Sequence, residues 1–183
     1  MPAKILFVIG SMRKTSFNRQ LSEAAKKALE GKAEVSVLEY GDIPFMNQDI
    51  EFPTPEAISR VRKEVQAADG IWIFTPEYNA SYPGVLKNLL DWLSRPLIAN
   101  DFASGTAVTG KKFAISGIGG KNATAGSRAK LQELLEFMKV EVLGTSNGFI
   151  VNPEGWQTDA LTLSAEDQER IKQQAEEFLA FIA

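Results

Sequence analysis

Short segments made only of apolar residues alternate along this chain with longer segments in which apolar residues recur every three or four positions. The first kind occurs at 5–9 and 71–74. A strand that is apolar on both faces is typical of a parallel sheet covered by helices on both sides. The second kind predicts amphipathic helices. They are expected at 16–28, 54–68, 83–93, 124–139 and 164–182.

This alternation predicts a doubly wound α/β fold, a three-layer α/β/α sandwich around a five-stranded parallel sheet. The strands are expected at 5–9, 34–40, 71–74 and 113–116, with a fifth in two pieces at 140–143 and 149–151. The longest stretches without periodicity, about 95–112 and 152–163, are expected to be irregular insertions. With 183 residues and 44% hydrophobic content, we expect one domain over 1–183 that buries roughly 70% of its unfolded surface.

The chain contains neither cysteine nor histidine, which excludes disulfides, thiolate chemistry and the commonest general base. No metal site is expected. The 20 basic and 23 acidic residues give a net charge of −3 without a basic run, so a nucleic acid is not an expected partner. Any chemistry must therefore rest on carboxylates, hydroxyls, lysines or a borrowed cofactor.

The apolar run at the N-terminus stops at Gly10. It is too short for the hydrophobic part of a signal peptide with its cleavage site, and far too short to cross a bilayer. We therefore expect a cytoplasmic protein without a membrane partner.

Ligands of open parallel sheets bind beyond the carboxyl ends of the strands, where the strand order reverses. The loops that follow the first, third and fourth predicted sheet strands therefore hold the candidate site. They span 10–18, 75–83 and 116–126, and all three are rich in small or hydrogen-bonding residues.

The loop at 10–18 joins a strand to the N-terminus of a helix. It carries the hydroxyls of Ser11, Thr15 and Ser16, the amide of Asn18 and the cation of Arg13. Backbone N–H groups and the positive end of the helix dipole make such a place an anion site. Because the dinucleotide pattern G-x-G-x-x-G is absent, a terminal phosphate fits better than a pyrophosphate. The alternative interpretation is a capped helix with an exposed arginine.

The loop at 75–83 is stiffened by Pro76 and Pro83. Between them, the backbone of 77–79 can face the edge of a flat heteroaromatic ring, while Tyr78 and Tyr82 offer stacking faces. A planar ring together with a phosphate one loop away describes FMN. The alternative is a turn packed on its own tyrosines, with Glu77 in an ion pair or an interface.

The same two loops resemble the motifs of a known family. GSMRKTSFNRQL at 10–21 resembles GSxRxxSxNxxL, and TPEYNASYPGVLKNLLDW at 75–92 resembles TPEYNxSxPxxLKNxxDW. Both motifs are typical of the NAD(P)H-dependent FMN reductases of flavodoxin-like fold, a group that includes bacterial quinone, chromate and azo-dye reductases. The resemblance in order and spacing extends over 4–150.

The resemblance implies a sheet order of 2-1-3-4-5 and FMN bound by three loops. Residues implied to hold the phosphate and the ribityl chain are Ser11, Arg13, Ser16, Phe17 and Asn18. Residues implied to line the isoalloxazine are Pro76, Glu77, Tyr78 and Asn79. Residues implied to close its far edge are Ser116, Gly117 and Gly119. One departure is Ala80, where family members often carry an aromatic residue.

By the same resemblance, the chain is expected to be an oxidoreductase that passes electrons from NAD(P)H through FMN to quinones, azo compounds, metal oxyanions or free flavin. The order would be ping-pong, with no catalytic side chain. A homodimer or homotetramer is implied, with the flavin near the subunit boundary. Two alternatives remain open: an electron carrier of the flavodoxin type, which would usually be more acidic than −3, and a nucleotide-binding regulator without a redox role.

Overall fold

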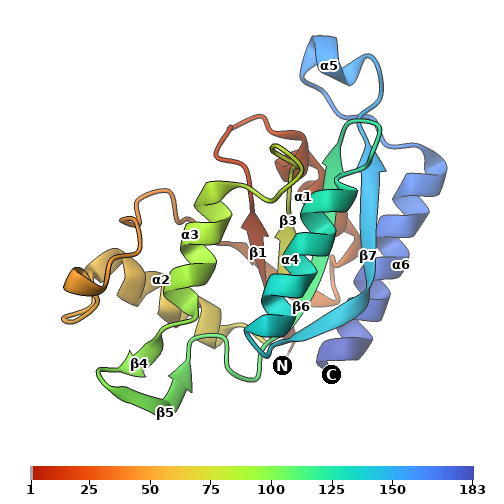
Figure 1. The fold of residues 1–183 in the computed structure, drawn as a ribbon. Helices are drawn as coiled ribbons and strands as arrows, with labels where there is room; N and C mark the ends of the chain where they lie inside the picture. The colour runs from red at the N-terminus through yellow and green to blue at the C-terminus, as the bar shows by residue number, and fades with distance from the viewer. Residues whose placement is uncertain (1) are drawn as a thin grey trace.

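Parallel strands form the central layer in a computed structural model of the chain, which describes residues 2–183 (Figure 1). Over these residues the sheet consists of β1 (Ala3–Ile9), β2 (Ala33–Val37), β3 (Gly70–Phe74), β6 (Lys112–Gly119) and β7 (Glu141–Ile150). Their order is β2-β1-β3-β6-β7, and each neighbouring pair is parallel. The predicted five-stranded parallel sheet is confirmed. The order 2-1-3-4-5 numbered only the sheet strands, and the chain places two further strands between the third and the fourth.

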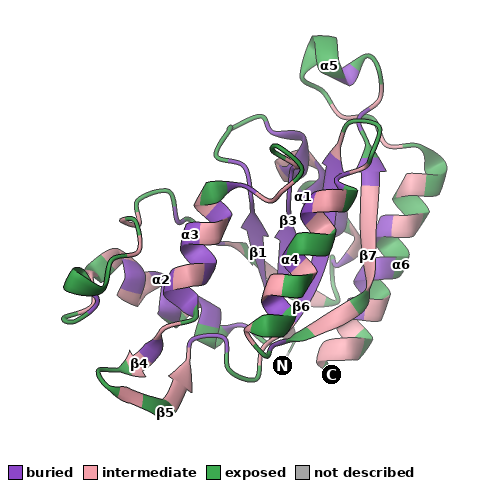
Figure 2. Cartoon of the chain, in the orientation of Figure 1, coloured by how far each residue is buried: buried purple, intermediate pink, exposed green. Residues whose placement is uncertain are grey.

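Helices cover both faces of the sheet. α1 (Phe17–Ala28) and α6 (Ala165–Ile182) pack on one face, while α2 (Glu56–Ala67), α3 (Gly84–Leu93) and α4 (Ala125–Phe137) pack on the other. Successive side chains of a strand point to opposite faces. Phe7 therefore belongs to the core under α1 and α6, and its neighbour Leu6 belongs to the core under the other three helices. Figure 2 shows the resulting pattern, in which the central strands β1, β3 and β6 are largely buried and the outer faces of the helices are exposed.

The stretch 95–112 was expected to be irregular, but part of it is regular. It contains an antiparallel hairpin of β4 (Pro96–Ile98) and β5 (Asp101–Thr106), with a left-handed Asn100 in the turn. The hairpin projects from the body of the protein (Figure 2). Of its strand residues only Pro96 is buried, so the sequence shows no alternation of buried and exposed positions. Ile98 and Phe102 are 57% and 78% exposed.

The last strand is a single element, whereas the sequence predicted two pieces. β7 runs from Glu141 to Ile150, but its pairing with β6 shifts. Phe113 pairs with Val142 and Ile115 pairs with Ser146, so β7 holds more residues than β6 over this stretch. Gln174 of α6 fills the gap: its Nε2 donates to the carbonyls of Ile115 and Thr145, both at 2.9 Å. A buried helix side chain therefore supplies hydrogen bonds that the ladder lacks at this point.

The stretch 152–163 also contains an element that was not predicted, the short helix α5 (Gly155–Thr158). It stands beyond the carboxyl ends of β6 and β7 (Figure 1). A 3₁₀ turn, η1 (Gln48–Ile50), precedes α2. Among residues 2–183, no helix combines the length and the apolar composition that crossing a membrane requires.

Candidate functional site

A cavity of about 360 Å³ lies beyond the carboxyl ends of β1, β3 and β6. The predicted site residues that line it are Ser11, Arg13, Ser16, Phe17, Asn18, Pro76, Glu77, Tyr78 and Gly119. Lining residues that were not predicted are Ile118, Gly120, Asn122, Trp156 and Asp159. A larger groove of about 590 Å³ runs along α1 and α6. That groove is away from the strand ends, so the smaller cavity is the candidate site.

The loop after β1 is ordered by its own hydroxyls. Ser16 is the N-cap of α1, as predicted, and its Oγ accepts a hydrogen bond from the backbone N–H of Arg19 at 3.2 Å. Ser11 Oγ accepts from the N–H of Arg13 at 3.4 Å and lies 3.5 Å from the Tyr78 hydroxyl. Both serines are buried. The loop thus presents the N-terminus of α1 to the cavity, which favours an anion there.

Arg13 already has a partner. Its Nη1 donates to Asp159 Oδ1 at 2.7 Å, and its guanidinium lies 5.3 Å from the centre of the Phe17 ring. The side chains of Arg13 and Asp159 are 46% and 56% exposed. The predicted cation therefore faces the cavity, but a carboxylate 146 residues later in the chain is bound to it.

Asn18 lines the cavity, yet its amide is used within the fold. Nδ2 donates to the carbonyl of Ile118 and Oδ1 accepts from the N–H of the same residue, both at 3.1 Å. This pair fastens the start of α1 to the carboxyl end of β6. The amide was expected to hold a ligand, whereas here both of its heavy atoms serve the framework of the site.

Glu77 joins two of the loops. Helix α4 begins at a left-handed Thr124 that makes no side-chain cap, and the carboxylate of Glu77 supplies acceptors from outside the helix. It accepts from the backbone N–H of Ser127 at 3.0 Å and from the amide of Asn122. The bond from Ser127 is the main reason that the pKa of Glu77 lies below its ordinary value. A negative charge at a helix N-terminus is favourable.

Replacing Glu77 by glutamine is expected to lower the free energy of unfolding at neutral pH by about 0.5–1 kcal/mol, a small value for a cap because the carboxylate is partly exposed. The folded pKa is depressed, so the carboxylate stabilises the fold above its unfolded pKa of about 4.3. That contribution is lost as the pH falls through the folded pKa. Urea unfolding of both proteins at several pH values checks this. The exposed Glu133 of the same helix provides the control variant Glu133→Gln. Equal acid sensitivity of wild type and Glu77→Gln would contradict the assignment.

Asn79 does not line the cavity. Asn79 and Ala80 have φ of 51° and 59°, and Tyr78 and Ser81 exchange backbone hydrogen bonds across them at 2.9 and 3.1 Å. Two consecutive positive φ values are those of a type I′ turn. Asn79 therefore sits at the exposed tip of a tight turn, and Ala80 occupies a conformation that residues other than glycine rarely adopt.

Ser116 and Gly117 also lie outside the cavity wall. The Ser116 hydroxyl is buried among Trp72 and Gln174, accepting from the first at 3.0 Å and donating to the second at 2.7 Å. A Cβ on Gly117 would lie 2.2 Å from Thr124 Oγ1 and 2.5 Å from the carbonyl of Thr75. Only glycine therefore fits at position 117, for a packing reason.

Trp156 and Asp159 come from the segment around α5, where the sequence showed no periodicity. Trp156 packs edge-to-face on Phe17, with ring centres 5.3 Å apart. A tryptophan within a polar, glycine-containing stretch was the signal that could have pointed to this segment. The contact of Asp159 with Arg13 had no signal, because it joins residues from opposite ends of the chain.

A parallel sheet in this order, with a polar cavity and a helix N-terminus at the ends of its central strands, defines a flavodoxin-like α/β protein whose candidate site suits an anionic ligand. The family model described as NADPH-dependent FMN reductase matches residues 3–152, and the chain belongs to that family.

Known proteins and structures agree with this family. A 2-hydroxy-1,4-benzoquinone reductase from Burkholderia sp is 43% identical over 96 residues, which are 52% of this chain and 52% of that protein. A quinone reductase from Escherichia coli is 33% identical over 143 residues, 76% of this chain and 73% of that protein. The solved structure of FerB, a flavoenzyme NAD(P)H:(acceptor) oxidoreductase from Paracoccus denitrificans, superposes with a TM-score of 0.79 at 26% identity, covering 98% and 97% of the two chains. The chain spans about half the length of the first curated relatives it matches.

Proposed function

We propose that this protein is an FMN-dependent oxidoreductase that passes electrons from NAD(P)H to a small-molecule acceptor such as a quinone. The observation that carries the proposal is that both family motifs line one cavity, the first through Arg13 and the start of α1 and the second through Pro76 to Tyr78. Relatives named quinone reductase support the acceptor class. Azo compounds, metal oxyanions and free flavin remain further candidate acceptors.

The residues present fit FMN. The hydroxyls, the arginine and the helix N-terminus of the loop after β1 form a donor set that suits a phosphate. Tyr78 and Trp156, 52% and 58% exposed, offer aromatic faces at the cavity. The volume of about 360 Å³ falls within the ~300–1,000 Å³ of small-molecule sites.

When bound, FMN would supply the chemistry of hydride and electron transfer. The chain itself has no cysteine or histidine side chain to take part in it. In this proposal the protein contributes binding and orientation. Arg13, Ser11 and the N-terminus of α1 hold the phosphate, and the loop from Pro76 to Tyr78 flanks the ring. Glu77 and Asn18 act as positioning residues, because they tie the site's loops to α4 and β6. No side-chain acid or base is assigned. Nicotinamide and acceptor would enter the same cavity in turn, a ping-pong order.

Titration of the protein with FMN, followed by NADH or NADPH under anaerobic conditions, tests this proposal. We expect stoichiometric FMN binding, loss of the oxidised flavin absorbance without a partner reductase, and its return when a quinone is added. Bound FMN that stays oxidised would instead support an electron carrier. A protein that binds no FMN would overturn the proposal. Sedimentation of the same sample checks the predicted homodimer or homotetramer.

A further inference from the structure

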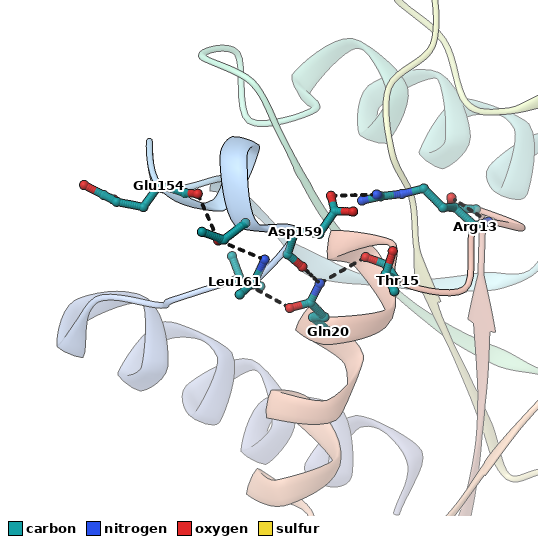
Figure 3. A network of polar contacts seen from close by, with 9 residues as sticks. Arg13, Thr15, Gln20, Glu154, Asp159 and Leu161 are labelled. Atoms are coloured by element: carbon teal, nitrogen blue, oxygen red, sulfur yellow. Dashed lines mark hydrogen bonds and ion pairs between the residues drawn. The ribbon is translucent and has the colours of Figure 1, made fainter.

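The segment around α5 folds back onto the loop after β1 through a polar network (Figure 3). Gln20 of α1 holds it: Nε2 donates to the carbonyls of Asp159 and Thr15 at 2.8 and 3.0 Å, and Oε1 accepts from the N–H of Leu161 at 2.8 Å. The backbone of the segment is thereby fixed at Asp159 and at the second residue after it.

The Asp159 carboxylate is aimed at the cavity by this backbone. Its own N–H donates to Gly155 at 2.9 Å, and its φ of 57° ends α5 in a left-handed turn. With the N–H and the carbonyl both bound within the fold, the side chain projects toward Arg13 (Figure 3). Trp156 adds the contact with Phe17 that holds the segment against the start of α1.

A carboxylate at this place has a consequence for an anion site. Asp159 binds the guanidinium that faces the cavity, and it also lines the cavity itself. An incoming phosphate must take Arg13 from Asp159 or share it, and it meets a second negative charge in either arrangement. The family match ends at residue 152, so this carboxylate belongs to a segment outside the matched region.

We propose that Asp159 is a specificity-determining residue that competes with the ligand phosphate for Arg13. It thereby lowers the ratio by which the site binds FMN more tightly than uncharged riboflavin. This inference rests on the proposed function. The internal carboxylate weakens binding of the phosphorylated flavin alone, because riboflavin brings no charge to Arg13. The site therefore holds FMN less tightly than its arginine and helix N-terminus would allow.

The variant Asp159→Asn tests this, because asparagine keeps the size of the side chain and removes its charge. The apoprotein is titrated with FMN and with riboflavin, following the flavin fluorescence. We expect the Kd for FMN to fall roughly three- to tenfold, a modest change because the pair is half-exposed. The Kd for riboflavin should change by less than about twofold. High salt should shrink the difference between variant and wild type.

Glu154→Gln is the matched control. Glu154 is an exposed acid of the same segment that does not line the cavity and accepts instead from Asn152 at 3.3 Å. It should change neither affinity. Affinities of Asp159→Asn for FMN and for riboflavin that both equal those of wild type overturn the inference. An equal change for both flavins also overturns it, because that result would indicate a loosened segment. A wild-type protein that binds neither flavin overturns the proposed function itself, and this inference with it.

Discussion

Replacing Arg13 by alanine is expected to weaken FMN binding roughly ten- to a hundredfold while riboflavin binding changes little. A hydrogen bond to a charged group contributes about 1.5–3 kcal/mol, and about 1.4 kcal/mol corresponds to a factor of ten in Kd. In the wild type the Asp159 carboxylate lies 2.7 Å from Arg13. The variant leaves this carboxylate without its cation, so that an unneutralised negative charge faces the incoming phosphate. Both effects act in the same direction, which makes this the largest change in ligand affinity that we expect from a single substitution.

Fluorescence titration with both flavins measures the effect. Arg13→Lys should give an intermediate FMN affinity, because lysine keeps the charge and loses the planar fork of donors. Lys14→Ala is the control, since Lys14 is exposed and does not line the cavity. If Arg13→Ala bound FMN as wild type does, the phosphate would have to sit elsewhere.

The elements with one dominant local pattern could be predicted from the sequence. The all-apolar segments 5–9 and 71–74 lie within β1 (Ala3–Ile9) and β3 (Gly70–Phe74). Ser16 and Ser164 both cap the helices that were expected to follow them. In each case the residues near one another in the chain decide the outcome, through burial on both faces or through a cap.

The elements that the sequence did not reveal depend on distant residues. The continuous β7 needs Gln174 at its irregular point, and the segment around α5 needs Gln20 and the Phe17 ring. The hairpin of β4 and β5 buries too little to leave a periodic pattern. No local pattern encodes such contacts.

The site divides in the same way. The motifs predicted which loops meet, because the ends of parallel strands share one edge of the sheet. They did not show which of the residues that line the cavity use their polar groups to hold the site together. Asn18 bridges 100 residues to Ile118, and Glu77 bridges 50 residues to Ser127. Such side chains fix the relative positions of the loops before any ligand arrives, which is the arrangement that precise binding needs.

The largest loss of stability is expected at Gln174, which is fully buried and does not line the cavity. Leucine in its place has a similar volume but leaves the carbonyls of Ile115 and Thr145 without the hydrogen bonds they now accept. The Ser116 hydroxyl would lose its acceptor and keep only its bond from Trp72. A buried polar group without a partner costs about 1–3 kcal/mol. We therefore expect Gln174→Leu to lower the free energy of unfolding by roughly 2–4 kcal/mol, a large share of the ~5–15 kcal/mol of a typical domain.

Urea unfolding measures this loss. An unchanged slope of the free energy of unfolding against urea concentration would show that the native and unfolded states keep their compactness. Gln173→Leu is the matched control on the same helix, because Gln173 is exposed and its amide bonds only Glu177, at 3.0 Å. That change should stay within about 0.5 kcal/mol. If Gln174→Leu unfolded at the same urea concentration as Gln173→Leu, the shifted pairing of β6 and β7 would have to be stable without the amide. The cause would then lie in the packing of the strands themselves.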